Sequence, residues 1–224
     1  MEGLLQEGET ARPNQPPPPL LSLYANREGG VTHQHLTEGL GISDKDKLLR
    51  RCERATENRK SGSMLFWTLG GEQVGLAAQE GWQKVLAPLL ESDIPARLWP
   101  FDGDMEALLE EKGLVLVETY PAEAYLHLEM NTGGFSKNDH EDRKGQSGAF
   151  FRWAAARRAK FAPALHNSIS DGFGGGDHGE DRFDATVGLC SMIEVLLGQR
   201  PEGAPQDEAI RSVEGWIFGQ TDHT

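Results

Sequence analysis

A carboxylate at the end of an apolar run is the first candidate for chemistry in this sequence. Glu118 follows the run from Leu114 to Val117, and Pro121 comes shortly after it. Because proline cannot donate a hydrogen bond to a neighbouring strand, we expect a strand that ends near Glu118, at the carboxyl edge where open α/β sheets bind ligands. Two ordinary roles compete equally with this one, since Glu118 would also serve as a cap for the following helix or as the partner of an arginine.

Two aspartates form the second candidate. Asp181 and Asp184 stand three positions apart in EDRFDATVGLC, at the predicted start of a long helix. This spacing places both carboxylates on one helical face, close enough to share a divalent cation. The competing interpretation is helix capping, because the unpaired amides and the dipole of a first turn also favour acids. Taken alone, the pair fits capping better.

A basic segment from Arg143 to Lys160 is the third candidate, and it contains no acid. Its basic residues are interleaved with the aromatic residues Phe150, Phe151 and Trp153, a pattern typical of nucleic-acid contact surfaces. A helix with a buried aromatic face and a solvated basic face explains the same pattern and is the more common arrangement. If the segment does bind nucleic acid, the expected contacts are Arg152, Arg157, Arg158 and Lys160.

The elements that must position these residues are helices alternating with strands. Apolar residues recur at helical spacing between Glu72 and Leu90, where Pro88 ends or kinks the helix. The other predicted elements are a solvated helix within 44–60, a strand at 96–103, a helix at 104–113, an interior strand at 114–121, a helix at 147–161, a last helix marked by Ala185, Leu189, Met192, Ile193 and Leu196, and a closing strand at 216–219. This alternation favours an α/β class over an all-α class.

Length and composition set the outer limits. Residues 1–19 end in the run Pro16 to Pro19 and are predicted to form a disordered tail, which leaves residues 20–224 for a single domain. The formal net charge of −13 argues against a protein that coats nucleic acid or membrane by bulk electrostatics. Two distant cysteines and a start without a signal peptide predict a cytoplasmic protein, and no apolar run is long enough to span a membrane.

Three segments together resemble a known family. VETYPAE at 117–123, DRFDA at 181–185 and EGWIFG at 214–219 resemble the DUF429 family of predicted nucleases with the ribonuclease-H-like fold. The segment at 50–71 is similar to that family's middle region, so the likeness covers about residues 45–220. The aspartate pair followed by alanine also resembles the last acidic pair of the Holliday-junction resolvases that share this fold.

This resemblance implies a mixed sheet with flanking helices and a metal-dependent nuclease site. Glu118, Asp181 and Asp184 would be both the catalytic residues and the ligands of two Mg²⁺ or Mn²⁺ ions. Hard cations prefer oxygen ligands, and two such ions activate a water and stabilise the leaving oxygen in phosphodiester hydrolysis. The ions would also supply the positive charge that an acidic protein needs in order to meet a polyanion.

The sequence departs from the family pattern at its beginning. Members of this fold start with a strand that carries a glycine and an essential aspartate, and nothing upstream of the proline run fits that strand. We therefore expect an N-terminally short member. Its site would bind metal weakly, borrow a ligand from Glu123, Asp177 or another chain, or be inactive. His178, in the glycine-rich segment at 171–181, is a further candidate for metal binding or proton transfer, although a loop histidine is more often simply solvated.

The leading hypothesis is thus a metal-dependent nuclease-like protein that hydrolyses phosphodiesters at a carboxylate-bound cation site. The runner-up is a non-catalytic scaffold of the same fold that binds nucleic acid or protein. A small-molecule hydrolase that uses the same carboxylates is a third class, since fold analogy does not exclude it.

Overall fold

The computed structural model describes residues 41–57, 59–64 and 74–221. The predicted tail at residues 1–19 lies outside them. The described residues fall into two compact units, one of residues 41–49, 63–64 and 74–78 and one of residues 50–57, 59–62 and 79–221. The described part of the first unit contains the 3₁₀ helix η1 (Lys45–Leu48), which the Asp44 side chain caps by accepting a hydrogen bond from the Asp46 amide.

The second unit contains a small parallel sheet. Strands β1 (Ala96–Leu98) and β2 (Leu114–Leu116) pair in parallel, with Ala96 opposite Leu114 and Leu98 opposite Leu116. Helix α5 (Met105–Glu110) connects them, as the sequence predicted. The predicted closing strand is reduced to a single parallel bridge between Ile217 and Glu118, which continues β2. The structure is therefore a mixed helix and strand protein, consistent with a general α/β class.

Glycine is required where the chain enters β2. Gly113 has φ +140°, and a Cβ added to it would lie 2.3 Å from the carbonyl oxygen of Pro95. No other residue fits this close approach, which allows the Leu114 amide to donate to Pro95 O and begin the ladder. The glycine thus marks the start of the strand as well as the end of the preceding helical segment.

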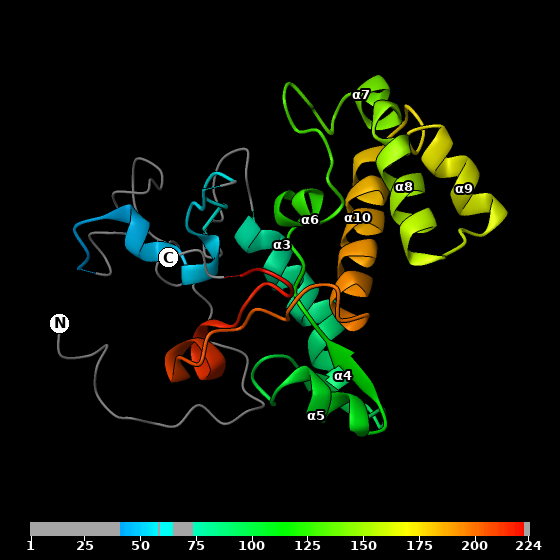
Figure 1. Cartoon of the computed structure of the whole chain (residues 1–224). Helices are drawn as coiled ribbons and strands as arrows, with labels where there is room; N and C mark the ends of the chain where they lie inside the picture. Colours follow the sequence, from blue (N-terminus) through cyan, green and yellow to red (C-terminus); the bar gives the residue numbers. More distant parts are fainter. Residues whose placement is uncertain (1–40, 58, 65–73, 222–224) are drawn as a thin grey trace. The chain divides into compact units, whose positions relative to one another are not determined.

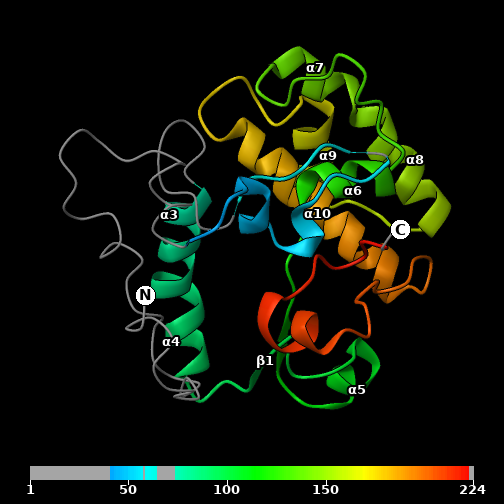
Figure 2. The ribbon, with the colours of Figure 1, turned by 90° about the vertical axis from the view of Figure 1, so that its left-hand side faces the viewer.

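Several further helices belong to the second unit. They include α6 (Pro121–His127), α7 (His140–Gly145), α8 (Ser147–Arg157), α9 (Pro163–Ser170), α10 (Gly179–Leu196) and the π-helical turn η4 (Ile210–Glu214). Helix α6 packs directly against α10, and the two lie side by side in both views (Figures 1 and 2). The C-terminal segment, red in both figures, meets the chain just beyond the end of β2, where Ile217 bridges to Glu118.

Two hydrophobic clusters hold this unit together. One joins α6, α8, α9 and α10 and has Phe150, Phe183 and Val187 at its fully buried centre. The other surrounds the sheet and includes Trp99, whose ring meets that of Phe218 edge to face at 4.9 Å. Burying such large side chains is the main source of stability, because each removes well over a hundred square ångströms of apolar surface from water, by rough estimate.

Helix α10 is present where the sequence predicted a last long helix, but its buried face differs. Leu189 and Leu196, two of the expected markers, are 46% and 52% exposed. The buried face runs instead through Phe183, Val187 and Cys190, which recur at helical spacing and meet the aromatic cluster. Apolar spacing alone did not identify the correct face, because several apolar stripes run along this helix.

The predicted amphipathic helix at 72–90 is also helical, in three pieces. These are α3 (Val74–Gly81), a π-helical turn (Trp82–Leu86) and α4 (Ala87–Leu90). The amide of Ala87 donates to Trp82 O, five residues back. Pro88 follows directly and has no amide to donate, which accounts for the altered hydrogen-bond pattern. None of the side chains at 82–90 is buried among the described residues.

The prediction of a solvated helix within 44–60 was wrong. The chain forms two short 3₁₀ turns, η1 and η2 (Arg51–Glu53), and three residues on and after η2 are buried. Cys52 is fully buried, and Glu53 and Arg59 are 5% and 9% exposed. The charged residues here make specific ion pairs with other segments, and those partners replace the hydration that a surface helix would keep.

Candidate functional site

Glu118 lies directly beyond β2, as predicted, and its carboxylate is held by Arg50. Arg50 Nη1 donates to Glu118 Oε2 at 2.8 Å, and Nη2 donates to Oε1 at 2.6 Å. The Arg50 side chain is 11% exposed and that of Glu118 is 45% exposed. The pairing with an arginine, one of the two ordinary roles foreseen for Glu118, is therefore present in the structure.

Arg50 is fixed from a second side by Glu53. Its Nε donates to Glu53 Oε1 at 2.9 Å, and its backbone amide donates to Oε2 of the same residue at 2.8 Å. Burial alone would lower the pKa of Arg50, but the hydrogen bonds and charge of Glu118 raise it above its ordinary value, so the guanidinium stays charged. Arg50 is thus a permanent cation between two carboxylates.

Asp184 lies in the first turns of α10 and is also fully engaged. Its Oδ1 accepts a hydrogen bond from the Tyr125 hydroxyl at 2.5 Å, and its Oδ2 accepts one from Lys137 Nζ at 2.6 Å. The Asp184 side chain is only 14% exposed, whereas Lys137 is 46% exposed. Burial would lower the pKa of Lys137, but hydrogen bonding to Asp184 and the nearby negative charges raise it, so the ammonium group is retained.

Asp181, the third predicted ligand, lies in a much wetter environment. Its side chain is 70% exposed, and its Oδ2 lies 3.1 Å from Nδ1 of His178, which is 74% exposed. Asp181 and Asp184 therefore share a helix but not an environment. Of the two residues considered as borrowed ligands, Glu123 is occupied elsewhere in a buried network, and Asp177 is exposed.

The end of β2 and helix α10 approach each other closely. A Cβ added to Gly188 would lie 2.9 Å from Thr119 Oγ1, so glycine is needed at this contact. Gly188 is one helical turn beyond Asp184, and Thr119 is the neighbour of Glu118. Thr119 and Gly188 thus bring the end of β2 into contact with α10. Within the described ranges, however, no group of three or more His, Cys, Asp or Glu side chains is arranged to hold a metal ion.

A buried polar network around Glu123 was not foreseen from the sequence. Glu123 is 2% exposed and accepts a hydrogen bond from Arg59 Nε at 2.9 Å. His127 Nε2 lies 3.5 Å from Glu123 Oε1 without forming a well-aligned hydrogen bond, and His127 Nδ1 lies 2.6 Å from Ser191 Oγ. This serine, histidine and glutamate series has the residue types of a nucleophilic triad. Because Ser191 is 1% exposed, it has no access to a substrate and the network is structural.

The basic segment is only partly available for binding. Arg157, one of the four predicted contacts, donates from Nε and Nη2 to the two carboxylate oxygens of Glu194 at 2.6 and 2.7 Å. Arg143 is 3% exposed and donates to three backbone carbonyls. Phe150 and Trp153 are buried, as the competing interpretation of this segment expected. Arg152, Arg158 and Lys160 are exposed.

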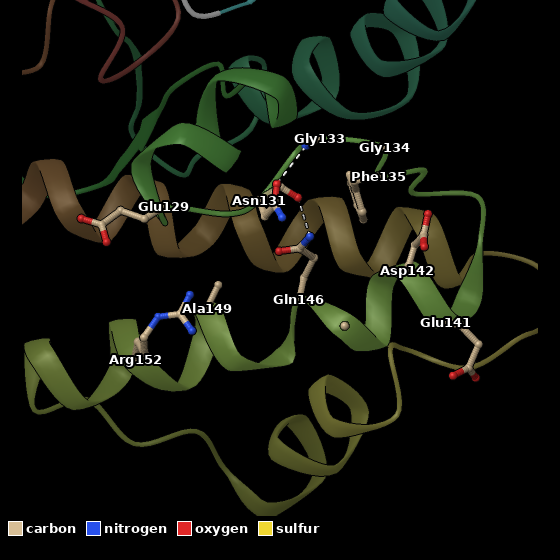
Figure 3. A pocket seen from close by; sticks show the side chains of 11 residues that line it. Glu129, Asn131, Gly133, Gly134, Phe135, Glu141, Asp142, Gln146, Ala149 and Arg152 are labelled. Atoms are coloured by element: carbon tan, nitrogen blue, oxygen red, sulfur yellow. Dashed lines mark hydrogen bonds between the residues drawn. The ribbon is translucent and has the colours of Figure 1, made fainter.

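A polar pocket of about 360 Å³ lies between the segment at 129–135 and helices α7 and α8. Figure 3 shows Gln146 and Asn131 joined near its middle, where Gln146 Nε2 donates to Asn131 O at 2.7 Å, with Glu129 and Arg152 at one end. Phe135 forms part of the lining and packs edge to face against Tyr125, with ring centres 5.6 Å apart. The pocket wall therefore also supports the tyrosine that binds Asp184.

The partners of the predicted ligands carried no signal in the sequence. Arg50 and Lys137 are separated from their carboxylates by 68 and 47 positions, and neither stands in a recognisable motif.

A scan of protein-family models found no match to the chain, and searches of curated proteins and of solved structures found no similar protein. No helix within the described ranges is long and apolar enough to cross a membrane.

Proposed function

We propose that this protein is a nuclease-like domain of the ribonuclease-H-like class that acts as a nucleic-acid-binding scaffold rather than as a phosphodiesterase. One observation carries the proposal. All four carboxylate oxygens of Glu118 and Asp184 already accept hydrogen bonds from Arg50, Tyr125 and Lys137. The fold assignment is supported by the sequence resemblance and by the parallel pair β1 and β2 with its helical crossover.

The hydrogen-bond donors around Glu118 and Asp184 do not fit a site in which three carboxylates share two metal ions. A divalent cation competes with these donors for the carboxylate oxygens, each of which already uses one lone pair. Binding at Glu118 would release Arg50, whose side chain is 11% exposed, from one of its two carboxylate partners. Because Glu118 is 45% exposed, losing this pair costs on the order of 1 kcal/mol, which a metal ion at Glu118 would have to offset. The protein's own cations neutralise these acids instead.

The ligand of the scaffold is proposed to be single-stranded nucleic acid, bound through Arg152, Arg158 and Lys160. Arg152 lies within α8, Arg158 and Lys160 lie just beyond its end, and all three are exposed. Exposed cations of this kind can contact phosphates even in a protein of net charge −13, because salt screens distant charges over about 8 Å.

The proposal is tested by fluorescence anisotropy with a labelled single-stranded oligonucleotide, in DNA and RNA form, at low and at physiological salt. We expect affinity to fall with a log–log salt slope near −2, roughly 0.7 for each of three phosphate contacts. The triple variant Arg152→Gln, Arg158→Gln, Lys160→Gln should lose that slope. The matched control Lys84→Gln, Arg97→Gln, Lys112→Gln has the same change in charge and should bind as the wild type does. Equal binding by both triple variants would overturn the proposal.

A metal-dependent nuclease remains the second candidate, favoured by the close approach of Thr119 to Gly188. This contact brings the end of β2 to the helix that carries Asp181 and Asp184. The test is cleavage of single-stranded and branched DNA and of RNA in Mn²⁺. Cleavage by the wild type that Asp184→Asn abolishes, while Glu141→Gln leaves it intact, would establish this function in place of the scaffold.

A further inference from the structure

We propose that Lys137 is a built-in counter-cation that keeps divalent metal ions off Asp184. The inference deepens the proposed function, on which it rests, by assigning one residue that opposes metal binding at the acidic site. Lys137 Nζ lies 2.6 Å from Asp184 Oδ2, and the Tyr125 hydroxyl donates to Oδ1 of the same carboxylate.

The ammonium group and a divalent cation compete for the same oxygen. An ion bound to Asp184 Oδ2 would lie about 2.0–2.6 Å from that oxygen, no farther away than the ammonium nitrogen at 2.6 Å. The two positive charges would also repel each other strongly in a location where the carboxylate is only 14% exposed. Occupation by Lys137 and occupation by a metal ion therefore exclude each other.

Hydrogen bonds hold the main chain around Lys137 in place, and this positions the lysine side chain beside Asp184. Arg143 Nη1 donates to Lys137 O at 2.6 Å, and the Ser136 amide donates to Asp142 Oδ2 at 2.8 Å. Arg143 is 3% exposed and also holds the carbonyls of Gly172 and Gly174. A metal ion that binds Asp184 Oδ2 would therefore have to displace the Lys137 side chain while the backbone stays in place.

Removing the ammonium group would leave Asp184 bound by Tyr125 on one oxygen and with the other oxygen free, one helical turn from the exposed Asp181.

The experiment is isothermal titration of the folded chain with Mn²⁺ alone. We expect Lys137→Met to bind one Mn²⁺ about tenfold more tightly than the wild type, because a competing cation has been removed. The double variant Lys137→Met, Asp184→Asn should lose that gain. Lys137→Arg, which keeps the charge, should behave as the wild type does, and the melting temperature of each variant in the absence of metal reports whether it is folded.

Lys144→Met is the matched control. Lys144 lies in the same unit, is 49% exposed against 46% for Lys137, and has only a distant contact with Glu141. It should leave Mn²⁺ binding unchanged. If Lys137→Met binds no better than the wild type, or if Lys144→Met gains as much, the inference is overturned. Its failure leaves the scaffold proposal standing, since that proposal is judged by oligonucleotide binding and not by metal affinity.

Discussion

Arg50 and Glu118, 68 positions apart in the chain, form an ion pair in which two guanidinium nitrogens meet two carboxylate oxygens at 2.8 and 2.6 Å. The pair joins the segment before η2 to the end of β2. It also neutralises the carboxylate at the end of β2. Arginine is well suited to this role, because its planar fork matches the carboxylate geometry and does not lose its proton.

Removing either member of this pair should have unequal effects. Arg50→Met leaves the 5% exposed Glu53 without its partner, so we expect unfolding by urea to require about 2–4 kcal/mol less free energy. Glu118→Gln leaves Arg50 paired with Glu53 and releases a side chain that is already 45% exposed. We therefore expect it to lower the free energy of unfolding by only about 1 kcal/mol. Equal losses in the two variants would show that Glu53 does not depend on Arg50.

Gly188 is predicted to be intolerant of even a methyl group. Gly188→Ala places a Cβ 2.9 Å from Thr119 Oγ1 and should cost about 1–3 kcal/mol through overpacking. Adding Thr119→Ala to the same chain should recover part of the loss, because it removes the clashing oxygen. The control is Gly81→Ala, where a Cβ meets nothing within 4 Å and the backbone is helical, so a gain of about 0.5–1 kcal/mol is expected. Thermal unfolding measures all three.

Glu123 should be essential for stability although it takes no part in chemistry. Glu123→Gln leaves Arg59, 9% exposed, without its charged partner and should cost about 3–5 kcal/mol. Glu141→Gln, at a side chain that is 76% exposed, should change stability by less than about 0.5 kcal/mol. Similar values for the two variants in denaturant titrations would contradict the buried network.

His127 should make the protein less stable as the pH falls. Burial lowers the pKa of His127 below its ordinary value of 6.5, and Arg200 lowers it further, while Glu123 opposes the shift. As the pH falls through 6.5, His127 therefore takes up a proton in the unfolded chain before it does so in the folded chain. The contribution of neutral His127 to the free energy of unfolding is full above pH 6.5 and is lost as the pH falls below it. The pKa of Glu123 is also lowered, because contacts with His127 and Arg59 outweigh burial, but its contribution is lost only below pH 4.5.

The measurement is the free energy of unfolding between neutral pH and pH 5. His127→Gln keeps a side chain that can bond to Ser191 and should flatten the decline seen in the wild type. His178→Gln, at a side chain 74% exposed, should leave the decline unchanged. A wild-type curve no steeper than that of His127→Gln would contradict this assignment.

The sequence predicted features that depend on neighbouring residues better than features that depend on contacts between residues far apart in the chain. Local apolar periodicity, together with glycine and proline at the ends of elements, predicted most of the regular structure. It predicted the crossover of β1, α5 and β2, the helices at 74–90 and 147–157, and the last helix. The position of Glu118 beyond β2 followed from the same local signals. Whether that carboxylate would face a metal or an arginine did not, because Arg50 reaches it from 68 positions away.

The basic segment from Arg143 to Lys160 shows the same limit. Its six basic residues looked equivalent in the sequence, yet Arg143 and Arg157 are fixed by partners, whereas Arg152, Arg158 and Lys160 are exposed. The partners are loop carbonyls and Glu194, which tertiary packing alone brings close. Likewise, the buried face of α10 was set by neighbouring helices and not by the most regular apolar stripe.

The central claim is that this protein's own cations occupy its acidic site, and anomalous diffraction at the manganese edge tests it most directly. Crystals equilibrated with millimolar Mn²⁺ should show no manganese peak at Glu118 or Asp184. They should retain the Arg50 to Glu118 and Lys137 to Asp184 pairs. A manganese peak bound jointly by Glu118, Asp181 and Asp184, with Arg50 and Lys137 turned away, would contradict the account and restore the metal-dependent nuclease.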